Sequence, residues 1–566
     1  MRNKFAVPLI VLGVLLMLIG IGQRTIWAPP ETESASAAAD AGTGVVTVLD
    51  KELLADYPEG VDITVRSGDP FTLAVGRAND VEAWVGEAAA NRLGTVDGGE
   101  LSLTDEGGET PVPDPAGSDL WVIEESGQGE LAYDWEAPGD GDWEILLAAD
   151  GTAAAPTDVT LTWENDASTP LAVPLMVIGG LLAVLGLALL FLRSGDTPGR
   201  GGRRSADPER REAAGPDRAP GQPAPTTSGT PFTAFSPGKR RSALTAAVAA
   251  FALAVVPAPA MAGESGEDTG NQPVIQDSQL ERILKSVAGT VEAGDAAKDA
   301  SVLEPRVAGA AFELRKANYA VAAKSSDREA PVPVAAQELR TQSVSASESW
   351  PRTVVAVTQG EGNPVPQALL LVQDSARENY KLVSAVQMLP ASTFPQPPAA
   401  GTGAEEIPAD SDNGLAMSPQ TAVDALADSL TNPQGSNKDT FADNRFSDDV
   451  VKFQEQVQKD PKNEFATNTF KHTPDAAKTH ALRTDDGGAI VFGYLSNTFS
   501  STPKEAGDSV NLEGTVYEAL TGQASTDKGI DVNHGEAVLV YVPAAGSNGQ
   551  AVVVGAAQEL LSATLK

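Results

Sequence analysis

Cysteine is absent from the 566 residues, and histidine occurs only three times. The lack of cysteine excludes disulfides, thiolate metal sites and cysteine nucleophiles. Basic residues are scarce too, with 40 Lys and Arg against 77 Asp and Glu and a formal net charge of -37. Because neutralising phosphates requires clustered Lys and Arg, we expect no nucleic-acid partner. The sequence also lacks a phosphate-binding glycine loop, a zincin motif and a nucleophile elbow.

Three apolar runs are the most informative feature that is present: Phe5–Gly22, Leu171–Leu192 and Ala243–Ala262. Each has about 18–22 residues, the length that a helix needs to cross roughly 30 Å of hydrocarbon. The net-basic segment 193–242 lies between the last two runs, and short Arg-rich loops stay in the cytoplasm. The pattern therefore predicts a multi-pass protein of the cell membrane, with a cytoplasmic N-terminus, an extracytoplasmic C-terminus and the lipid bilayer as a partner.

The third run permits two interpretations. A basic trio precedes it, its centre is rich in alanine, and it ends with Ala260-Met261-Ala262 before Gly263. These features are typical of a signal peptide, here in mid-chain. The run is either an uncleaved third transmembrane helix or a signal sequence that is cut after Ala262, with Ala260, Ala262 and Gly263 forming the signal-peptidase site. Cleavage would release residues 263–566.

The basic segment 193–242 is dense in Pro, Gly, Ser and Arg and has almost no large apolar residues. This composition predicts a disordered cytoplasmic linker. Thr230 and Ser236 each precede a proline close to the basic trio, so a phosphoryl group there would meet Lys or Arg. A simple solvated tether is the alternative.

The first exported segment, residues 27–170, holds roughly thirty acidic residues against four basic ones. Short period-two stretches separated by Gly, Pro and Asp predict an antiparallel, all-β sandwich, with one short helix near residues 80–90. The expected strands are Val45–Leu49, Val61–Val65, Phe71–Val75, Leu120–Ile123, Glu130–Trp135, Trp143–Ala149 and Val159–Trp163.

Several short motifs of this segment are similar to the ectodomain of a family of uncharacterised actinobacterial integral membrane proteins. The motifs are Gly76-Arg77-Ala78, Asp80–Gly86, Asp119-Leu120-Trp121, Gly127-Gln128-Gly129, Trp135, Asp142-Trp143-Glu144 and Ala148–Gly151. The resemblance covers residues 1–192 and implies a β-rich domain between two membrane helices. It implies no activity.

Two ligand sites are open in this segment. If Trp84, Trp121, Trp135 and Trp143 were exposed, they would form a platform for sugar rings of the cell wall, whereas the alternative is that they fill the core. Asp140 and Asp142 form the best carboxylate pair for Ca²⁺. Because the ordered ligand spacing of a calcium loop is missing, we favour a solvated turn and expect no cofactor or metal.

The second exported segment contains an internal duplication. Apolar hairpins occur at 368–389 and 537–560, and two helical patterns precede each hairpin. Ser418 and Pro419 mark one helix start, as Asn444 marks another. Helices followed by a curled sheet are an α+β order, and this order resembles two NTF2-like domains in tandem.

The predicted organisation is thus a multidomain membrane protein with transmembrane α-helices, a sandwich-like ectodomain and a tandem α+β, NTF2-like C-terminal region. Its boundaries are 5–22 and 171–192 for two membrane helices, 27–170 for the β-rich domain, 193–242 for the linker, 243–262 for the third run, 270–395 and 416–566 for the repeats, and 390–415 for a Pro/Gly-rich connection.

No catalytic group can be assigned from motifs. NTF2-like isomerases use a buried carboxylate as base, and the sequence does not place one. Asp448 and Asp449 start an apolar helix and fit its N-terminal dipole. His472, His480 and His534 are expected to be ordinary strand or loop residues, because their spacing fits neither a triad nor a metal-binding helix.

Two functions stay open at this level. The first is a non-catalytic cell-envelope protein that presents acidic exported domains to an envelope protein or a cell-wall glycan. The second is an envelope enzyme, a transferase or isomerase that acts on glycan or lipid precursors. An enzyme would need unpaired carboxylates in a deep cleft of the C-terminal repeats.

Overall fold

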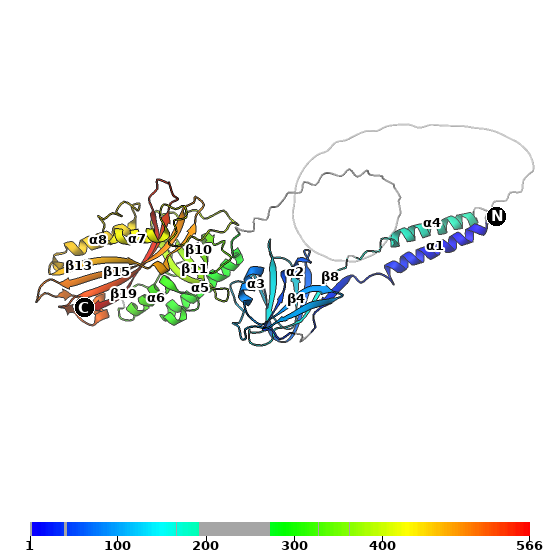
Figure 1. Ribbon diagram of the computed structural model, residues 1–566, viewed down its shortest axis with the longest axis horizontal. Helices are drawn as coiled ribbons and strands as arrows, with labels where there is room; N and C mark the ends of the chain where they lie inside the picture. The colour runs from blue at the N-terminus through cyan, green and yellow to red at the C-terminus, as the bar shows by residue number, and fades with distance from the viewer. Residues whose placement is uncertain (1–2, 39–41, 166, 192–271, 326–327, 362) are drawn as a thin grey trace, which may run out of the picture. The chain divides into compact units, whose positions relative to one another are not determined.

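The computed structural model describes residues 3–38, 42–165, 167–191, 272–325, 328–361 and 363–566 (Figure 1). It divides into two compact units. The first contains the helices at 3–24 and 172–191, and the second joins residues 30–166 to residues 268–566. The expected third apolar run, its cleavage site at Ala260, Ala262 and Gly263, and the linker residues Thr230 and Ser236 lie outside the described residues.

The first unit is a pair of apolar helices, α1 (Asn3–Arg24) and α4 (Ala172–Phe191). Both are long and apolar enough to cross a membrane, as expected for the first two runs. They pack side by side in opposite directions, because Gly20 lies against Ala172 while Gly186 lies against Ala6. Small residues gather where the helices touch, and large side chains such as Leu181 face outward.

Residues 30–166 of the second unit form an eight-stranded sheet in the order β6-β3-β7-β2-β4-β5-β1-β8. The strands and short helices are β1 (Thr32–Ser36), β2 (Val46–Leu49), α2 (Lys51–Ala55), β3 (Val61–Arg77), α3 (Ala78–Val85), β4 (Ala90–Asp97), β5 (Glu100–Glu106), β6 (Ile123–Trp135), β7 (Trp143–Ala148) and β8 (Asp158–Glu164).

This sheet corrects the predicted antiparallel sandwich. Strand β8 also pairs with β3, so the sheet closes on itself like a barrel, and β2–β4 and β1–β5 are parallel pairs. Closure follows from β3, a strand of 17 residues with an irregularity between Ser67 and Phe71. An irregular strand of this kind bends and can pair with different neighbours along its length. The expected strand at 120–123 is wrong, since β6 begins at Ile123 and Trp121 precedes it.

Residues 272–566 contain two successive sets of helices and strands, which we call the two copies. Each copy has two main helices and then four main strands, and the buried stripe of the first helix and the Ser418 cap are confirmed. The elements are α5 (Asp277–Ala297), η2 (Ala300–Val302), α6 (Gly309–Ala322), β9 (Leu339–Val344), β10 (Arg352–Thr358), β11 (Gln367–Gln373), β12 (Lys381–Met388), α7 (Pro419–Thr431), α8 (Arg445–Lys459), η3 (Pro461–Asn463), β13 (Ala466–Pro474), η4 (Ala476–Lys478), β14 (His480–Arg483), β15 (Ala489–Pro503), β16 (Val510–Asn511), α9 (Val516–Thr521), β17 (Ser525–Thr526), β18 (Ile530–Val542) and β19 (Val552–Leu565).

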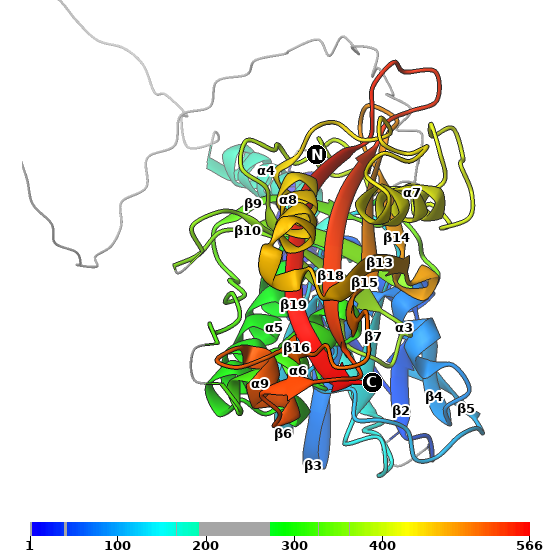
Figure 2. The same cartoon turned by 90° about the vertical axis from the view of Figure 1, so that its left-hand side faces the viewer.

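The two copies share one sheet, which differs from the expected pair of separate domains. Its main path runs β13-β15-β18-β19-β12-β11-β10-β9, with β14 beside β15, so the last strands of both copies meet in the middle. Figure 2 shows β15, β18 and β19 running side by side. Helix α5 packs on one half of the sheet and α7 on the other, and apolar residues of both halves fill a third cluster between them. The NTF2-like resemblance stays a prediction.

Candidate functional site

A cavity of about 470 Å³ lies beside α6, where the central strands of the two copies meet. Ligand pockets in proteins are commonly of this size. Its lining comes from α6, the loop after it, and strands β11, β12 and β19: Ala311, Leu314, Arg315, Asn318, Arg328, Glu329, Ala330, Pro331, Val332, Gln367, Ala385, Gln387, Ala557, Gln558 and Glu559.

Three charged groups of this cavity, Arg315, Arg328 and Glu559, are paired. Arg328 forms an ion pair with Glu559, and the Asn318 amide donates a hydrogen bond of 3.0 Å to the same carboxylate. Arg315 binds both oxygens of Asp295 at 2.8 and 2.7 Å and donates to the Val332 carbonyl at 2.7 Å. Burial raises the pKa of Glu559, and its hydrogen bonds to Asn318 and Arg328 oppose this shift. Of the two carboxylates that line the cavity, Glu559 is paired and Glu329 is exposed.

Apart from the exposed Glu329, neutral amides supply the remaining polar side chains of the lining. Gln367 and Gln387 come from neighbouring positions of β11 and β12, since they are direct partners in the strand register. Side-chain amides both donate and accept hydrogen bonds. A lining of amides, paired charges and small apolar residues suits a neutral polar ligand better than an ion.

A buried carboxylate lies directly behind this lining. Glu536 of β18 is fully buried, and its Oε1 accepts hydrogen bonds of 2.8 Å from both Asn497 and Gln558. Nε2 of His472 lies 3.6 Å from the same oxygen. Gln558 thus touches Glu536 and also lines the cavity. No hydrogen-bond donor to Oε2 of Glu536 is found in the described part of the chain.

The structure brings together two histidines that were expected to be scattered. His472, Asn497 and His534 are direct partners across β13, β15 and β18, and Glu536 follows two residues after His534 on the same strand face. Burial lowers the pKa of His534, helped by Arg328 and His472 and opposed by Glu536.

His480 lies apart on β14, and burial lowers its pKa as well. A sequence signal for the cluster existed, because the polar residues Asn533, His534 and Glu536 interrupt an otherwise apolar strand. Even so, among the described residues no group of three or more His, Asp or Glu could hold a metal ion.

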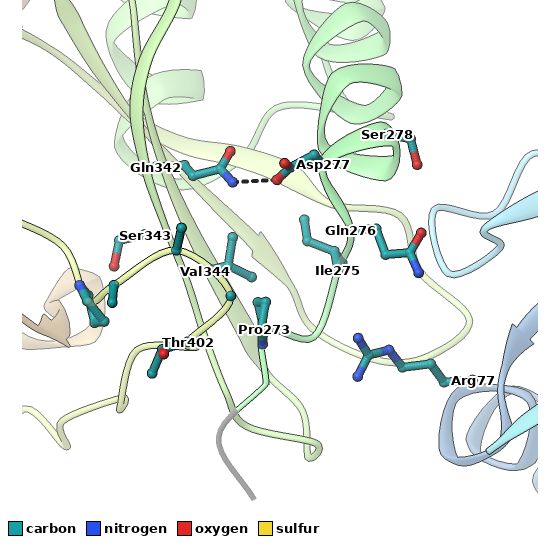
Figure 3. A pocket seen from close by; sticks show the side chains of 14 residues that line it. Arg77, Pro273, Ile275, Gln276, Asp277, Ser278, Gln342, Ser343, Val344 and Thr402 are labelled. Carbon is teal, nitrogen blue, oxygen red and sulfur yellow. Dashed lines mark hydrogen bonds between the residues drawn. The ribbon is translucent and has the colours of Figure 1, made fainter. Parts of the chain in front are cut away.

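A second cavity, of about 430 Å³, lies between the start of α5, strand β9 and the segment 398–402, with Arg77 at its edge. Figure 3 shows the Arg77 guanidinium reaching toward the cavity from the opposite side to Pro273, and Asp277 held by Gln342. That hydrogen bond, from Nε2 of Gln342 to Oδ1 of Asp277, is 2.7 Å long. Burial lowers the pKa of Arg77, and the Asp80 carboxylate opposes this shift.

An ionic cluster surrounds Arg92 in the β-rich domain. Its guanidinium contacts Glu82 at 2.6 Å, Glu106 at 2.9 Å and Asp50 at 3.4 Å. Nearby, Glu144 is only 3% exposed, and burial together with the charges of Glu82 and Asp50 raises its pKa to about 8. Burial also raises the pKa of Asp50. The cluster carries a protonated carboxylic acid at neutral pH.

The structure does not present the tryptophans as a sugar platform. Trp84, Trp121, Trp135 and Trp143 are between 0 and 4% exposed and belong to the two cores of residues 30–166. The indole N–H of Trp121 donates a hydrogen bond of 2.7 Å to the Pro115 carbonyl. Large rings dominate core burial, and this effect accounts for their position.

The other acidic candidates lie in a surface turn and at the start of a helix. Asp142 pairs with Lys51 at 3.1 Å across the surface, and Asp140 is exposed in the same turn. Asp448 lies in the first turn of α8 as expected, and Asp449 pairs with Arg445 at 2.7 Å.

Comparison with known proteins adds one finding. A family model described as "Domain of unknown function (DUF8094)" matches residues 271–564, which is more than half of the chain and includes the whole nine-stranded sheet with both copies. No curated protein matches the chain. The first 192 residues lie outside the family match, so the resemblance to actinobacterial membrane proteins stays a prediction.

Proposed function

The chain belongs to the DUF8094 family, and we propose that it is a non-catalytic membrane protein of the cell envelope whose C-terminal region binds a polar ligand outside the cytoplasm. The ligand class that suits the cavity beside α6 best is a neutral glycan fragment of the cell wall. The supporting observation is the lining itself, in which Glu559 and Arg315 are paired, Glu329 is exposed, and the other polar side chains are mainly amides.

Anchoring by α1 and α4 supports a role at the membrane. The helices are antiparallel, so the segment between them begins and ends at the same end of the pair. If both cross the bilayer, residues 30–166 lie on one side and the ends Asn3 and Phe191 lie on the other. Arg-rich sequence follows Phe191, which favours the cytoplasm for that side.

The enzyme alternative rests on Glu536. A buried carboxylate beside His472 resembles the acid–base pairs of many active sites in its residue types. Its side chain has no exposed surface, however, and Gln558 stands between it and the cavity. A general base must come within hydrogen-bond reach of the substrate. Binding without chemistry therefore fits this geometry better.

Calorimetric titration of the full chain in detergent tests the proposal, with soluble, uncharged fragments of N-acetylglucosamine oligomers as the probe. The matched variants are Ala385→Leu, which fills the cavity, and Gln523→Ala, an exposed amide far from it in sequence. We expect heat of binding for the wild type and for Gln523→Ala, and affinity at least about tenfold lower for Ala385→Leu.

Equal binding by all three proteins would place the ligand elsewhere, and no binding by any of them would reject a glycan ligand. Chemical change of the fragments, detected by mass spectrometry and lost in Glu536→Gln, would instead support the enzyme. A pull-down of envelope proteins with the same three variants separates a protein partner from a glycan.

A further inference from the structure

The acidic surface of residues 30–166 has a partner within the chain. Asp80, in the first turn of α3, contacts Arg352 of β10 at 2.7 Å, and the two side chains are only 3 and 1% exposed. The Arg352 guanidinium also lies 3.9 Å from the ring of Trp350 and donates to the Glu348 carbonyl at 2.8 Å. A buried, hydrogen-bonded ion pair is strongly destabilised when one member is removed.

A second buried carboxylate repeats the pattern. Asp119 pairs with Arg306, and it accepts a 2.8 Å hydrogen bond from the backbone N–H of Tyr380. Its own backbone N–H donates to the Asn379 side chain at 2.9 Å, and its carbonyl accepts from Gln279 at 3.1 Å. Every polar group of Asp119 is thus held by residues from the family-matched region.

A third arginine, Arg377, binds the C-terminal end of α3. Arg377 donates to the carbonyls of Trp84 and Val85 at 2.8 Å each, and it pairs with Glu109 at 2.9 Å. Carbonyls at a helix C-terminus lack partners within the helix and attract cations. Ala376 joins the apolar cluster of Trp84, so the contact is apolar as well as ionic.

In all three ion pairs the same region supplies the negative charge and the other region supplies the positive charge. The carboxylates Asp80, Glu109 and Asp119 come from residues 30–166, and the guanidinium groups come from residues 268–566. We call this surface the clasp. Because basic residues are scarce in a chain of net charge -37, three arginines at one surface give strong charge complementarity.

We propose that the clasp is a permanent docking surface, whose partner is the arginine-bearing face of the family-matched region. The two regions then stay bound when the connection between residues 167 and 267 is cut, and they lie on the same side of the membrane. If α4 crosses the membrane, the two regions share one side only when the chain crosses once more before residue 268, and the sequence predicts residues 243–262 for that crossing. The clasp shares no residue with the lining of the cavity beside α6. A failure of the docking proposal would therefore leave the proposed function untouched, and the reverse also holds.

Cutting the full chain tests the docking. A protease recognition sequence is inserted after residue 220, the detergent-solubilised protein is cut, and the N-terminal fragment is captured by a tag on its first residue. We expect the C-terminal fragment to be retained. Arg377→Glu, combined with Arg352→Glu, should reduce the retained fragment about tenfold or more. Arg340→Glu is the matched control, because this arginine is exposed and pairs with Glu338.

Loss of the wild-type C-terminal fragment on washing in buffer would overturn the proposal, as would equal retention of the double variant. Circular dichroism of the variants shows whether each remains folded. The single variant Arg377→Glu, at a less buried site, gives the same comparison with less risk to folding.

The absence of cysteine allows a clean test of membrane side. Asp97→Cys and Ser547→Cys each introduce one thiol at an exposed position, one in each docked region. A membrane-impermeant maleimide applied to intact cells should label both variants to a similar extent. The wild type, which has no thiol, should not be labelled. Labelling of only one of them, with both labelled after lysis, would contradict the clasp.

Discussion

Gly13 of α1 lies so close to Gly179 of α4 that a Cβ added at Gly13 would come within 2.5 Å of the Gly179 carbonyl oxygen. The relationship is reciprocal, because a Cβ added at Gly179 would lie 2.6 Å from the Gly13 carbonyl oxygen. Small residues allow this backbone approach between apolar helices, which cannot gain from burying side chains that lipid already solvates. The helix pair therefore depends on glycine at both positions.

Gly13→Leu should separate α1 from α4, because the added side chain has no space at the contact. Hydrogen–deuterium exchange of the full chain in micelles would measure the loss as faster exchange of backbone amides in both helices. Val14→Leu is the control, since Val14 is 43% exposed and faces away from the contact. Unchanged exchange in Gly13→Leu would show that the close approach does not hold the pair.

Glu144→Gln should stabilise the β-rich domain at neutral pH and leave it unchanged at pH 4. The pKa of about 8 in the folded chain lies above the ordinary value of 4.5, so the unfolded chain loses this proton first as pH rises. The wild type therefore loses stability between about pH 4.5 and 8, a loss that the amide avoids. Denaturant titration should give a gain of about 1–3 kcal/mol near pH 7.5. An equal effect at both pH values would contradict the raised pKa.

His534→Gln should flatten the acid side of the stability curve of the C-terminal region. The pKa of His534 in the folded chain lies below the ordinary value of 6.5, since burial disfavours its charged form and Arg328 and His472 add to this. As pH falls below 6.5, the unfolded chain gains a proton that the folded chain does not, and stability decreases. Unfolding free energies at pH 7 and 5 would show a smaller decrease in the variant. A decrease equal to wild type would mean that Glu536 keeps this histidine protonated.

Trp121→Ala should destabilise residues 30–166 by about 3–5 kcal/mol, because it leaves a large cavity beside Trp84. The ring is fully buried, and the two indole centroids lie 6.0 Å apart. Trp27→Ala changes a residue that is 63% exposed and should cost less than about 0.5 kcal/mol. Thermal unfolding of both variants measures the difference. Equally small decreases in Tm for the two variants would contradict the burial of Trp121.

Local features of the fold could be predicted from the sequence. The Ser418 cap, the stripe from Leu280 to Val291 and the apolar hairpins depend on neighbouring residues, so the signal lies within a few positions. The closed sheet could not be predicted, because closure depends on the irregularity in β3 that merges two expected strands. The joining of the two copies into one sheet could not be predicted either. It depends on a short pairing between β12 and β19, through Gln387–Ala556 and Met388–Gly555.

The candidate sites were harder still, because they depend on contacts between distant residues. His472 and Glu536 meet only after three strands align, and no spacing rule connects them. No local pattern predicts the clasp, for the same reason: Asp80 and Asp119 are buried against arginines more than 180 positions away in the sequence.

The last prediction concerns Glu536, whose Oε1 accepts two hydrogen bonds while its Oε2 accepts none from described residues. Glu536→Gln keeps an acceptor for Asn497 and Gln558 and removes a buried charge, so stability should change by less than about 1 kcal/mol or increase. Glu536→Leu leaves both amides without their acceptor and should cost about 2–4 kcal/mol. Denaturant unfolding measures both. If Glu536→Gln proves as costly as Glu536→Leu, the cluster depends on the second carboxylate oxygen, which the amide lacks.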